Sequence, residues 1–266
     1  MASVDLFERF LGGAGNPPLI ILHGLLGSSR NWKAAGEGLT ETFSVTALDL
    51  RNHGSSPWAA THGYADLVED LVHWLDAQGL ERASIMGHSM GGKAGMLFAC
   101  TYPERVEQLY IADISPRDYD PQYSDYLRAM EAIDTGSLKS RAEAESRLEL
   151  VVESWGMRQF LLTNLVRDPE GGFCWQVNIP VLLDAMPELA GNPLDEEARF
   201  DGPTLFLRGG RSPFIRDVDR GLIRKHFPKS HLVTLKEAGH NVHVDDRETF
   251  VESVVEARRF FESRDR

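Results

Sequence analysis

The chain has 266 residues, of which 42% are hydrophobic and 26% charged, a balance typical of a globular protein that forms one large domain or a domain with an insertion. The formal net charge of −12 argues against nucleic acid as a partner, because binding to phosphate groups needs a basic surface. The sequence has no apolar stretch of the ~20 residues that span a membrane, so we expect no membrane span. We also expect no secretory signal and free thiols at the two cysteines, which together favour a cytoplasmic location.

Short apolar runs alternate with helical patterns along residues 1–115. The apolar runs predict buried strands at residues 19–22, 45–48, 83–86 and 109–112. Leucines and valines recur at helical spacing between residues 64 and 78, and a second helix is expected from residue 90 to about 102, where Pro103 ends it. Strands that alternate with helices in this way predict an α/β fold, with a mostly parallel central sheet and helices on both faces.

The pattern changes between residues 116 and 200, where no convincing strand is found. Helical patterns cover residues 124–133, 140–154, 157–166 and 179–186. The alternation resumes with strands at 204–207 and 231–235, and a last helix with Asp246 as its N-cap. We therefore predict a core made of residues 1–115 and 201–266, with a helical lid, residues 116–200, inserted between two strands of one sheet. A decorative insertion is the alternative, although long insertions in compact domains usually carry function.

The most distinctive motif is GHSMG at residues 87–91, which matches the G-x-S-x-G pattern of a sharp strand-to-helix turn that exposes a serine. Because a serine hydroxyl is a weak nucleophile until a base takes its proton, the motif predicts Ser89 as a nucleophile and requires a histidine elsewhere. Two other interpretations exist. The pattern G-x-x-x-x-G-K at 87–93 is typical of a phosphate-binding loop, but Ala94 stands where that loop needs Ser or Thr. A glycine-rich turn with a solvated serine is the simplest alternative.

The ends of the other strands supply partners for Ser89. His240 follows the last strand, where the base of a Ser, acid, His triad is expected in chain order. His23 and Gly24 follow the first buried strand and are expected to border the substrate. In acyl transfer the carbonyl oxygen becomes negative, and we expect the backbone N–H groups of Leu25 and Met90 to bind it.

Two carboxylates compete for the role of the triad acid, which must accept a hydrogen bond from the histidine. Asp113 directly follows the strand at 109–112, whereas Asp217 lies beyond the turn after the strand at 204–207. We favour Asp113, because its position is fixed by the sheet. The pair His240 and His243 has the spacing of metal ligands, but no third ligand supports it, so we expect no metal and no cofactor.

Together these motifs resemble the α/β-hydrolase superfamily over residues 4–114 and 201–266, and more closely the bacterial YbfF-type esterases and their mitochondrial relatives. The matching strings are HGLLGSSRNW, DLRNHGSS, MGHSMGGK, ADISP, LRGGRSPFI and AGHNVH. In that group the triad acid follows the earlier strand, which this sequence matches at Asp113. The resemblance implies cleavage of short-chain esters and, in some members, of acyl-CoA thioesters.

The expected function is therefore that of a serine hydrolase acting on a small-molecule ester or thioester with a short to medium acyl chain, possibly bound to CoA, through an acyl-enzyme on Ser89. Large apolar residues of the predicted lid, among them Trp155, Phe160 and Trp175, are expected to line the acyl pocket. A carbon–carbon bond hydrolase of the same fold and a non-catalytic receptor for a small ligand are the alternatives. The oligomeric state is left open.

Overall fold

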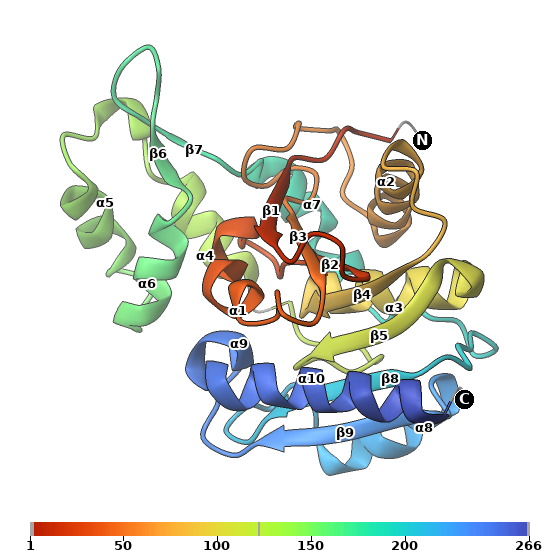
Figure 1. Cartoon of the computed structure of the whole chain (residues 1–266). Coiled ribbons are helices and arrows are strands. Elements are labelled where there is room, and N and C mark those ends of the chain that lie inside the picture. The colour runs from red at the N-terminus through yellow and green to blue at the C-terminus, as the bar shows by residue number, and fades with distance from the viewer. Residues whose placement is uncertain (1–2, 122, 265–266) are drawn as a thin grey trace.

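The computed structural model describes residues 3–121 and 123–264. Its centre is a seven-stranded sheet with the order β1-β3-β2-β4-β5-β8-β9 (Figure 1). The strands are β1 (Glu8–Gly12), β2 (Pro18–Leu22), β3 (Ser44–Leu48), β4 (Ala83–His88), β5 (Val106–Ala112), β8 (Thr204–Gly209) and β9 (Ser230–Leu235). All neighbours are parallel except β1 and β3, which confirms the mostly parallel sheet. The edge strand β1 has no counterpart in the sequence prediction.

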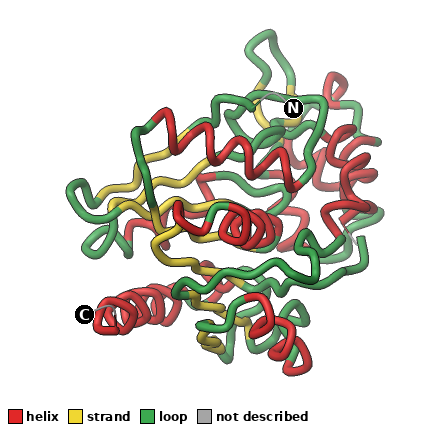
Figure 2. The backbone as a smooth tube through the Cα atoms, turned by 90° about the vertical axis from the view of Figure 1, so that its right-hand side faces the viewer, coloured by secondary structure: helices red, strands yellow, loops and turns green. Residues whose placement is uncertain are grey.

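Alternation along the strands sends their side chains to two separate cores. In β2, for example, Ile20 and Leu22 face one core while Leu19 and Ile21 face the other. The first core is closed by α2 (Tyr64–Ala77), α3 (Met90–Thr101) and α8 (Arg220–His226), and the second by α1 (Lys33–Glu37), α9 (Val242–Asp245) and α10 (Arg247–Arg264). Figure 2 shows these helices on either side of the strands.

Short 3-10 turns complete the core. They are η1 (Ser29–Trp32), η2 (Pro103–Arg105) and η4 (Asp217–Asp219). The expected N-cap of the last helix is present, since the Oδ1 atom of Asp246 accepts a hydrogen bond from the N–H of Thr249 at 3.3 Å. Among the described residues, no helix combines the length and the apolar character needed to cross a membrane.

The segment between β5 and β8, which we call the insertion, is mainly helical. It contains α4 (Tyr123–Glu131), η3 (Thr135–Ser137), α5 (Arg141–Leu148), α6 (Trp155–Leu162) and α7 (Ile179–Ala190). In Figure 1, α5 and α6 project away from the central sheet, whereas α7 packs close to it. Because β5 and β8 are parallel neighbours, the insertion begins at the edge where the strands deliver Ser89 and Asp113. The chain after α7 then returns to the opposite edge, where β8 begins.

One expectation for the insertion was wrong. Residues 165–175 form an antiparallel hairpin of β6 (Leu165–Arg167) and β7 (Phe173–Trp175), where the sequence suggested only helices. Each strand has three residues, too few to produce a recognisable alternation. The turn uses Gly171 and Gly172 at φ values of 111° and 81°, a backbone region that glycine adopts readily. The expected helix at 157–166 accordingly ends at Leu162.

Candidate active site

The motif around Ser89 has a steric cause. Ser89 joins β4 to α3 with φ 51° and ψ −118°, a strained conformation for a residue with a side chain. A Cβ on Gly87 would lie 2.2 Å from the carbonyl oxygen of Gly91, and one on Gly91 would lie 2.4 Å from that of Leu22. Both positions therefore exclude any side chain, and the tight turn presents the Ser89 hydroxyl at the edge of the sheet.

Asp113 and His240 meet beside Ser89. The Nδ1–H of His240 donates to Oδ2 of Asp113 at 2.9 Å, and Asp113 is fully buried. The other carboxylate oxygen, Oδ1, accepts the N–H of Gly209 at 2.8 Å, while the N–H of Asp113 donates to the carbonyl of Leu207 at 2.8 Å. β8 thus fixes the carboxylate, which in turn fixes the imidazole. The Nε2 atom of His240 is buried and has no hydrogen-bond partner among the described residues.

Sequence reasoning missed Ser212, which follows β8. Its hydroxyl donates to Oδ2 of Asp113, the oxygen that also binds His240. Two residues further on, the ring of Phe214 stacks on the imidazole of His240, with centroids 3.9 Å apart and an angle of 19° between the planes. The string LRGGRSPFI contains both residues, but only the folded chain shows that this turn contacts Asp113 and His240.

Asp217, the alternative acid, lies elsewhere. Its side chain is 76% exposed and pairs with Arg208 at 2.8 Å and with Arg220 at 3.3 Å. The hydrogen bonds from these two guanidinium groups hold the pKa of the Asp217 carboxyl below its ordinary value. The structure brings Asp113, not Asp217, to His240.

The loop after β2 lies directly against the nucleophile. A Cβ on Gly24 would lie 2.8 Å from Nδ1 of His88 and 3.2 Å from Cβ of Ser89, so only glycine allows this approach. Leu25 and Met90 both line the same cavity as Ser89. Their N–H groups belong to the two segments that meet at Ser89, which is the arrangement expected of an oxyanion hole.

His23 borders the cavity, but both of its ring nitrogens are bound to the backbone. Nδ1–H donates to the carbonyl of Gly24 at 2.8 Å, and Nε2 accepts the N–H of Leu50 at 2.9 Å. His53 braces the same loop, because its Nε2 accepts the N–H of Leu26 at 3.1 Å. Burial lowers the pKa of His23 and that of His53. Both imidazoles are therefore neutral supports of the loop that carries Leu25.

Two more buried histidines surround His240. Nε2–H of His88 donates to the carbonyl oxygen of His240 at 2.9 Å, and burial lowers the pKa of His88 well below its ordinary value. His243 stacks on Trp32 with centroids 4.0 Å apart, and burial lowers its pKa to about 3. Both rings are neutral at pH 7, so they add no positive charge beside His240. Within residues 3–121 and 123–264, no group of three or more His, Cys, Asp or Glu side chains could hold a metal ion.

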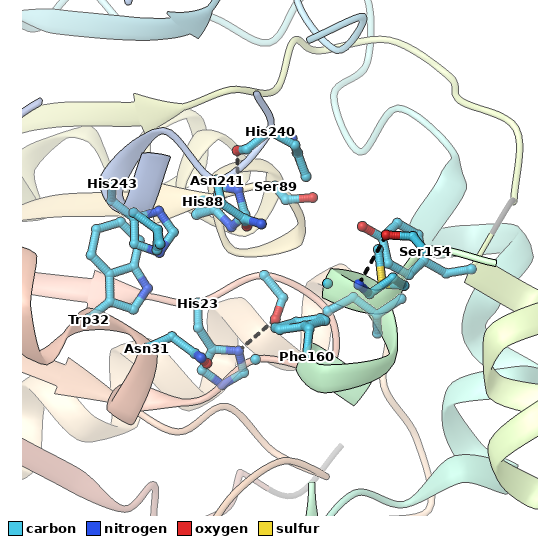
Figure 3. A pocket seen from close by; sticks show the side chains of 17 residues that line it. His23, Asn31, Trp32, His88, Ser89, Ser154, Phe160, His240, Asn241 and His243 are labelled. Carbon is cyan, nitrogen blue, oxygen red and sulfur yellow. Dashed lines mark hydrogen bonds between the residues drawn. The ribbon is translucent and has the colours of Figure 1, made fainter. Parts of the chain in front are cut away.

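Two cavities meet at Ser89, and Leu25 and Tyr123 also line both of them. The large cavity, of about 450 Å³, contains His240. In Figure 3, Trp32 and His243 lie together at one end of it, and Ser154 and Phe160 of the insertion border it at the other. The small cavity, of about 60 Å³, has mainly apolar walls. Those walls include Met90, Ile114, Tyr119, Met186, Leu189 and Phe214.

The three aromatic residues expected in the acyl pocket have different positions. Phe160 lines the large cavity. Trp155 is 65% exposed and lines neither cavity, and Trp175 packs within the insertion, where its indole N–H donates to the carbonyl of Met130 at 3.0 Å. The structure therefore does not bring Trp155 and Trp175 to the site. Helical periodicity could not reveal this, because it marks an apolar face without showing what covers that face.

A family model described as alpha/beta hydrolase fold matches residues 17–247. The chain belongs to the α/β-hydrolase fold family. This α/β hydrolase is 36% identical over 251 residues to sn-1-specific diacylglycerol lipase ABHD11 of Mus musculus, covering 91% of this chain and 81% of that relative. It is 32% identical over 240 residues to Esterase YbfF of Escherichia coli strain K12, covering 90% and 92% of the two chains. A solved structure titled "Marine microorganism esterase" has 36% identity and a TM-score of 0.92, covering 96% of this chain and 99% of that one. The resemblance to YbfF-type esterases is thus confirmed.

The position of the acid gives a first prediction. Asp113→Asn should lower kcat for an activated ester such as p-nitrophenyl acetate by a factor on the order of 10⁴, because an amide stabilises the wrong tautomer of His240. Asp217→Asn, the matched control, should retain the rate of the unmodified protein. A large loss confined to Asp217→Asn, with both variants folded by circular dichroism, would reject Asp113 as the acid.

A second prediction concerns Ser212. Ser212→Ala removes one charge-assisted hydrogen bond to Asp113, so kcat should fall about tenfold, the equivalent of roughly 1.5 kcal/mol. Ser253→Ala, which removes an exposed hydroxyl from α10, is the control and should leave kcat unchanged. Equal rates for the two variants would mean that Ser212 does not support the acid.

Proposed function

We propose that this α/β hydrolase is a serine carboxylesterase that forms an acyl-enzyme on Ser89. The observation that carries the proposal is the 2.9 Å hydrogen bond between Nδ1 of His240 and the buried carboxylate of Asp113, next to a strained serine. This bond leaves Nε2 as the ring nitrogen that can accept a proton. The names of the relatives, which include an esterase and a diacylglycerol lipase, support the same reaction class.

The proposed reaction has two halves. In the first, Oγ of Ser89 attacks the carbonyl carbon while Nε2 of His240 takes the hydroxyl proton, and the N–H groups of Leu25 and Met90 bind the oxyanion. The bond to the leaving alcohol then breaks as His240 returns the proton to the alcohol oxygen. In the second half, water gives a proton to His240 and attacks the acyl-enzyme, which releases the acid and restores the Ser89 hydroxyl.

The two cavities suggest how the ester is oriented. Because His240 must protonate the leaving oxygen, the alcohol portion belongs in the large cavity, which contains this histidine. The acyl portion then enters the small cavity, whose walls are mainly apolar. A cavity of about 60 Å³ holds a few groups the size of water, at ~10–15 Å³ of accessible space each, which favours an acyl chain of a few carbons.

An uncharged alcohol is favoured over CoA as the leaving group. The described residues that line the large cavity include no lysine or arginine, so the phosphates of an acyl-CoA would find no cationic partner there. The protein's net charge of −12 acts in the same direction at longer range. A thioester with a neutral thiol would satisfy the same site.

We also propose that residues 116–200 act as a lid. Met157 and Phe160 border the large cavity, and Met186 and Leu189 border the small one, so both cavities have one wall from the insertion. Such walls bind apolar substrate groups and exclude water from the acyl-enzyme.

Covalent labelling tests the nucleophile. A fluorophosphonate should modify Ser89 and no other residue, as mapped by mass spectrometry, because this hydroxyl shares the large cavity with His240, whose Nε2 atom can take its proton. Ser89→Ala should abolish the labelling and lower kcat by several orders of magnitude, on the order of 10⁶ in comparable triads. Labelling at another serine with Ser89 unmodified would reject the mechanism.

Acyl chain length tests the orientation. With p-nitrophenyl esters, kcat/KM should peak at the acetate or butyrate and fall by about tenfold or more at the octanoate, since each excess methylene costs roughly 1–3 kcal/mol in a closed pocket. Esters of acetate with bulkier alcohols should be accepted without this loss. The opposite pattern, tolerance of long acyl chains and rejection of large alcohols, would mean that the two cavities have exchanged roles.

A further inference from the structure

Lys93 is a buried cation that the proposed reaction does not use. We propose that it limits the length of the acyl chain by holding the end of α7 in place as a wall of the small cavity. This inference rests on the proposed esterase function and on the assignment of the small cavity to the acyl group. Lys93 is only 1% exposed and lines that cavity together with Ser89 and Met90.

The tie consists of hydrogen bonds to the end of a helix. The ammonium Nζ donates to the carbonyl oxygens of Gly191 at 2.6 Å, Ala190 at 3.0 Å and Leu189 at 3.5 Å. The last carbonyls of a helix have no partner within the helix and carry its partial negative charge, so an ammonium is well suited to hold them. Lys93 thus joins α3, the helix of the nucleophile, to α7, the last helix of the insertion.

Two tyrosines complete the junction. The ring centroids of Tyr119 and Tyr64 lie 4.7 Å and 5.9 Å from Nζ of Lys93, within the range of cation–π attraction. The hydroxyl of Tyr64 donates to the carbonyl of Leu189 at 2.8 Å, and the N–H of Tyr119 donates to that of Ala190 at 2.9 Å. The end of α7 is therefore held from three segments, and its apolar residues form a fixed wall of the small cavity.

The position of Lys93 in the sequence links the tie to the reacting atom. Lys93 lies one helical turn after Ser89, and its N–H donates to the carbonyl of Ser89 at 3.0 Å. One lysine side chain therefore connects the helix that follows the nucleophile directly to the end of α7. Loosening this connection would let Leu189 move away and lengthen the cavity.

A buried lysine at position 93 loses the hydration of its ammonium group, which costs free energy. Burial lowers the pKa of Lys93 to about 7, with Arg117 acting in the same direction and Asp118 opposing both. Among the described residues, no carboxylate forms an ion pair with it. An apolar side chain of similar length would avoid this cost, so a methionine at position 93 should leave the fold intact while removing the tie.

The test compares Lys93→Met with Cys100→Ala, a change on the same helix at a residue that lines neither cavity. We expect Lys93→Met to raise the ratio of kcat/KM for p-nitrophenyl octanoate to that for the acetate by about tenfold, the effect of room for one or two methylenes. Cys100→Ala should leave the ratio unchanged. If Lys93→Met only impaired the enzyme in general, kcat/KM would fall by the same factor for the octanoate and for the acetate. An unchanged ratio of the two would overturn the proposal.

A second variant guards against a folding failure. Tyr64→Phe removes only the hydroxyl that holds the carbonyl of Leu189, and it should shift the ratio in the same direction by a smaller factor. If Lys93→Met does not fold, Lys93→Gln keeps one donor group on a shorter side chain and should give an intermediate shift. A ratio that does not change in either folded variant would contradict the tie.

Hydrogen exchange separates this inference from the proposed function. Amide exchange in residues 187–192 should become faster in Lys93→Met and remain as in the unmodified protein in Cys100→Ala, regardless of activity. Absence of ester hydrolysis by the unmodified protein would reject the proposed function alone. Unchanged exchange in Lys93→Met would reject the tie alone.

Discussion

The active site depends on one buried carboxylate. Asp113 accepts hydrogen bonds from the backbone of Gly209, the hydroxyl of Ser212 and the imidazole of His240. A buried charge is tolerated only when such donors surround it. Because two of the donors belong to β8 and its turn, the pairing of β5 with β8 also sets the orientation of the His240 imidazole. The register of the sheet therefore determines how Asp113 and His240 lie relative to each other.

Two of the contacts that join the insertion to the core lie beside the cavities. At one, the amide of Asn164 donates to the carbonyl of Leu26 at 2.9 Å, in the loop that carries the expected oxyanion donor Leu25. At the other, Lys93 holds the end of α7 beside the small cavity. α5 and α6, which precede both anchors in the chain, stand away from the sheet (Figure 1). The insertion is thus held where it borders the two cavities.

The sequence was sufficient for the parts that depend on local pattern. Apolar strands, the steric demand at GHSMG and the order of the strand ends led to Ser89, Asp113 and His240, which the structure brings to one edge of the sheet. The parts that depend on tertiary contacts were not visible. Ser212 contacts Asp113 only because β8 lies beside β5 in the folded chain. The residue type of His23 would allow it to carry protons, and only the structure shows that both of its ring nitrogens are bound to the backbone. The three-residue strands β6 and β7 and the exposed position of Trp155 were not predicted for a similar reason. Neither periodicity nor residue type shows what a segment packs against.

The neutral histidines described around the site make the stability of the protein depend on pH. Four buried imidazoles around the site have a pKa lowered below the ordinary 6.5: His23, His53, His88 and His243. The unfolded chain takes up these protons more readily, so the stability they contribute is complete above pH 6.5 and declines as the pH falls below it. For each such group the slope is about 1.4 kcal/mol per pH unit until its folded pKa is reached. Since His23 and His53 brace the loop of Leu25 by accepting N–H bonds only while they are neutral, the shape of this loop and the stability of the fold depend on pH through the same two imidazoles.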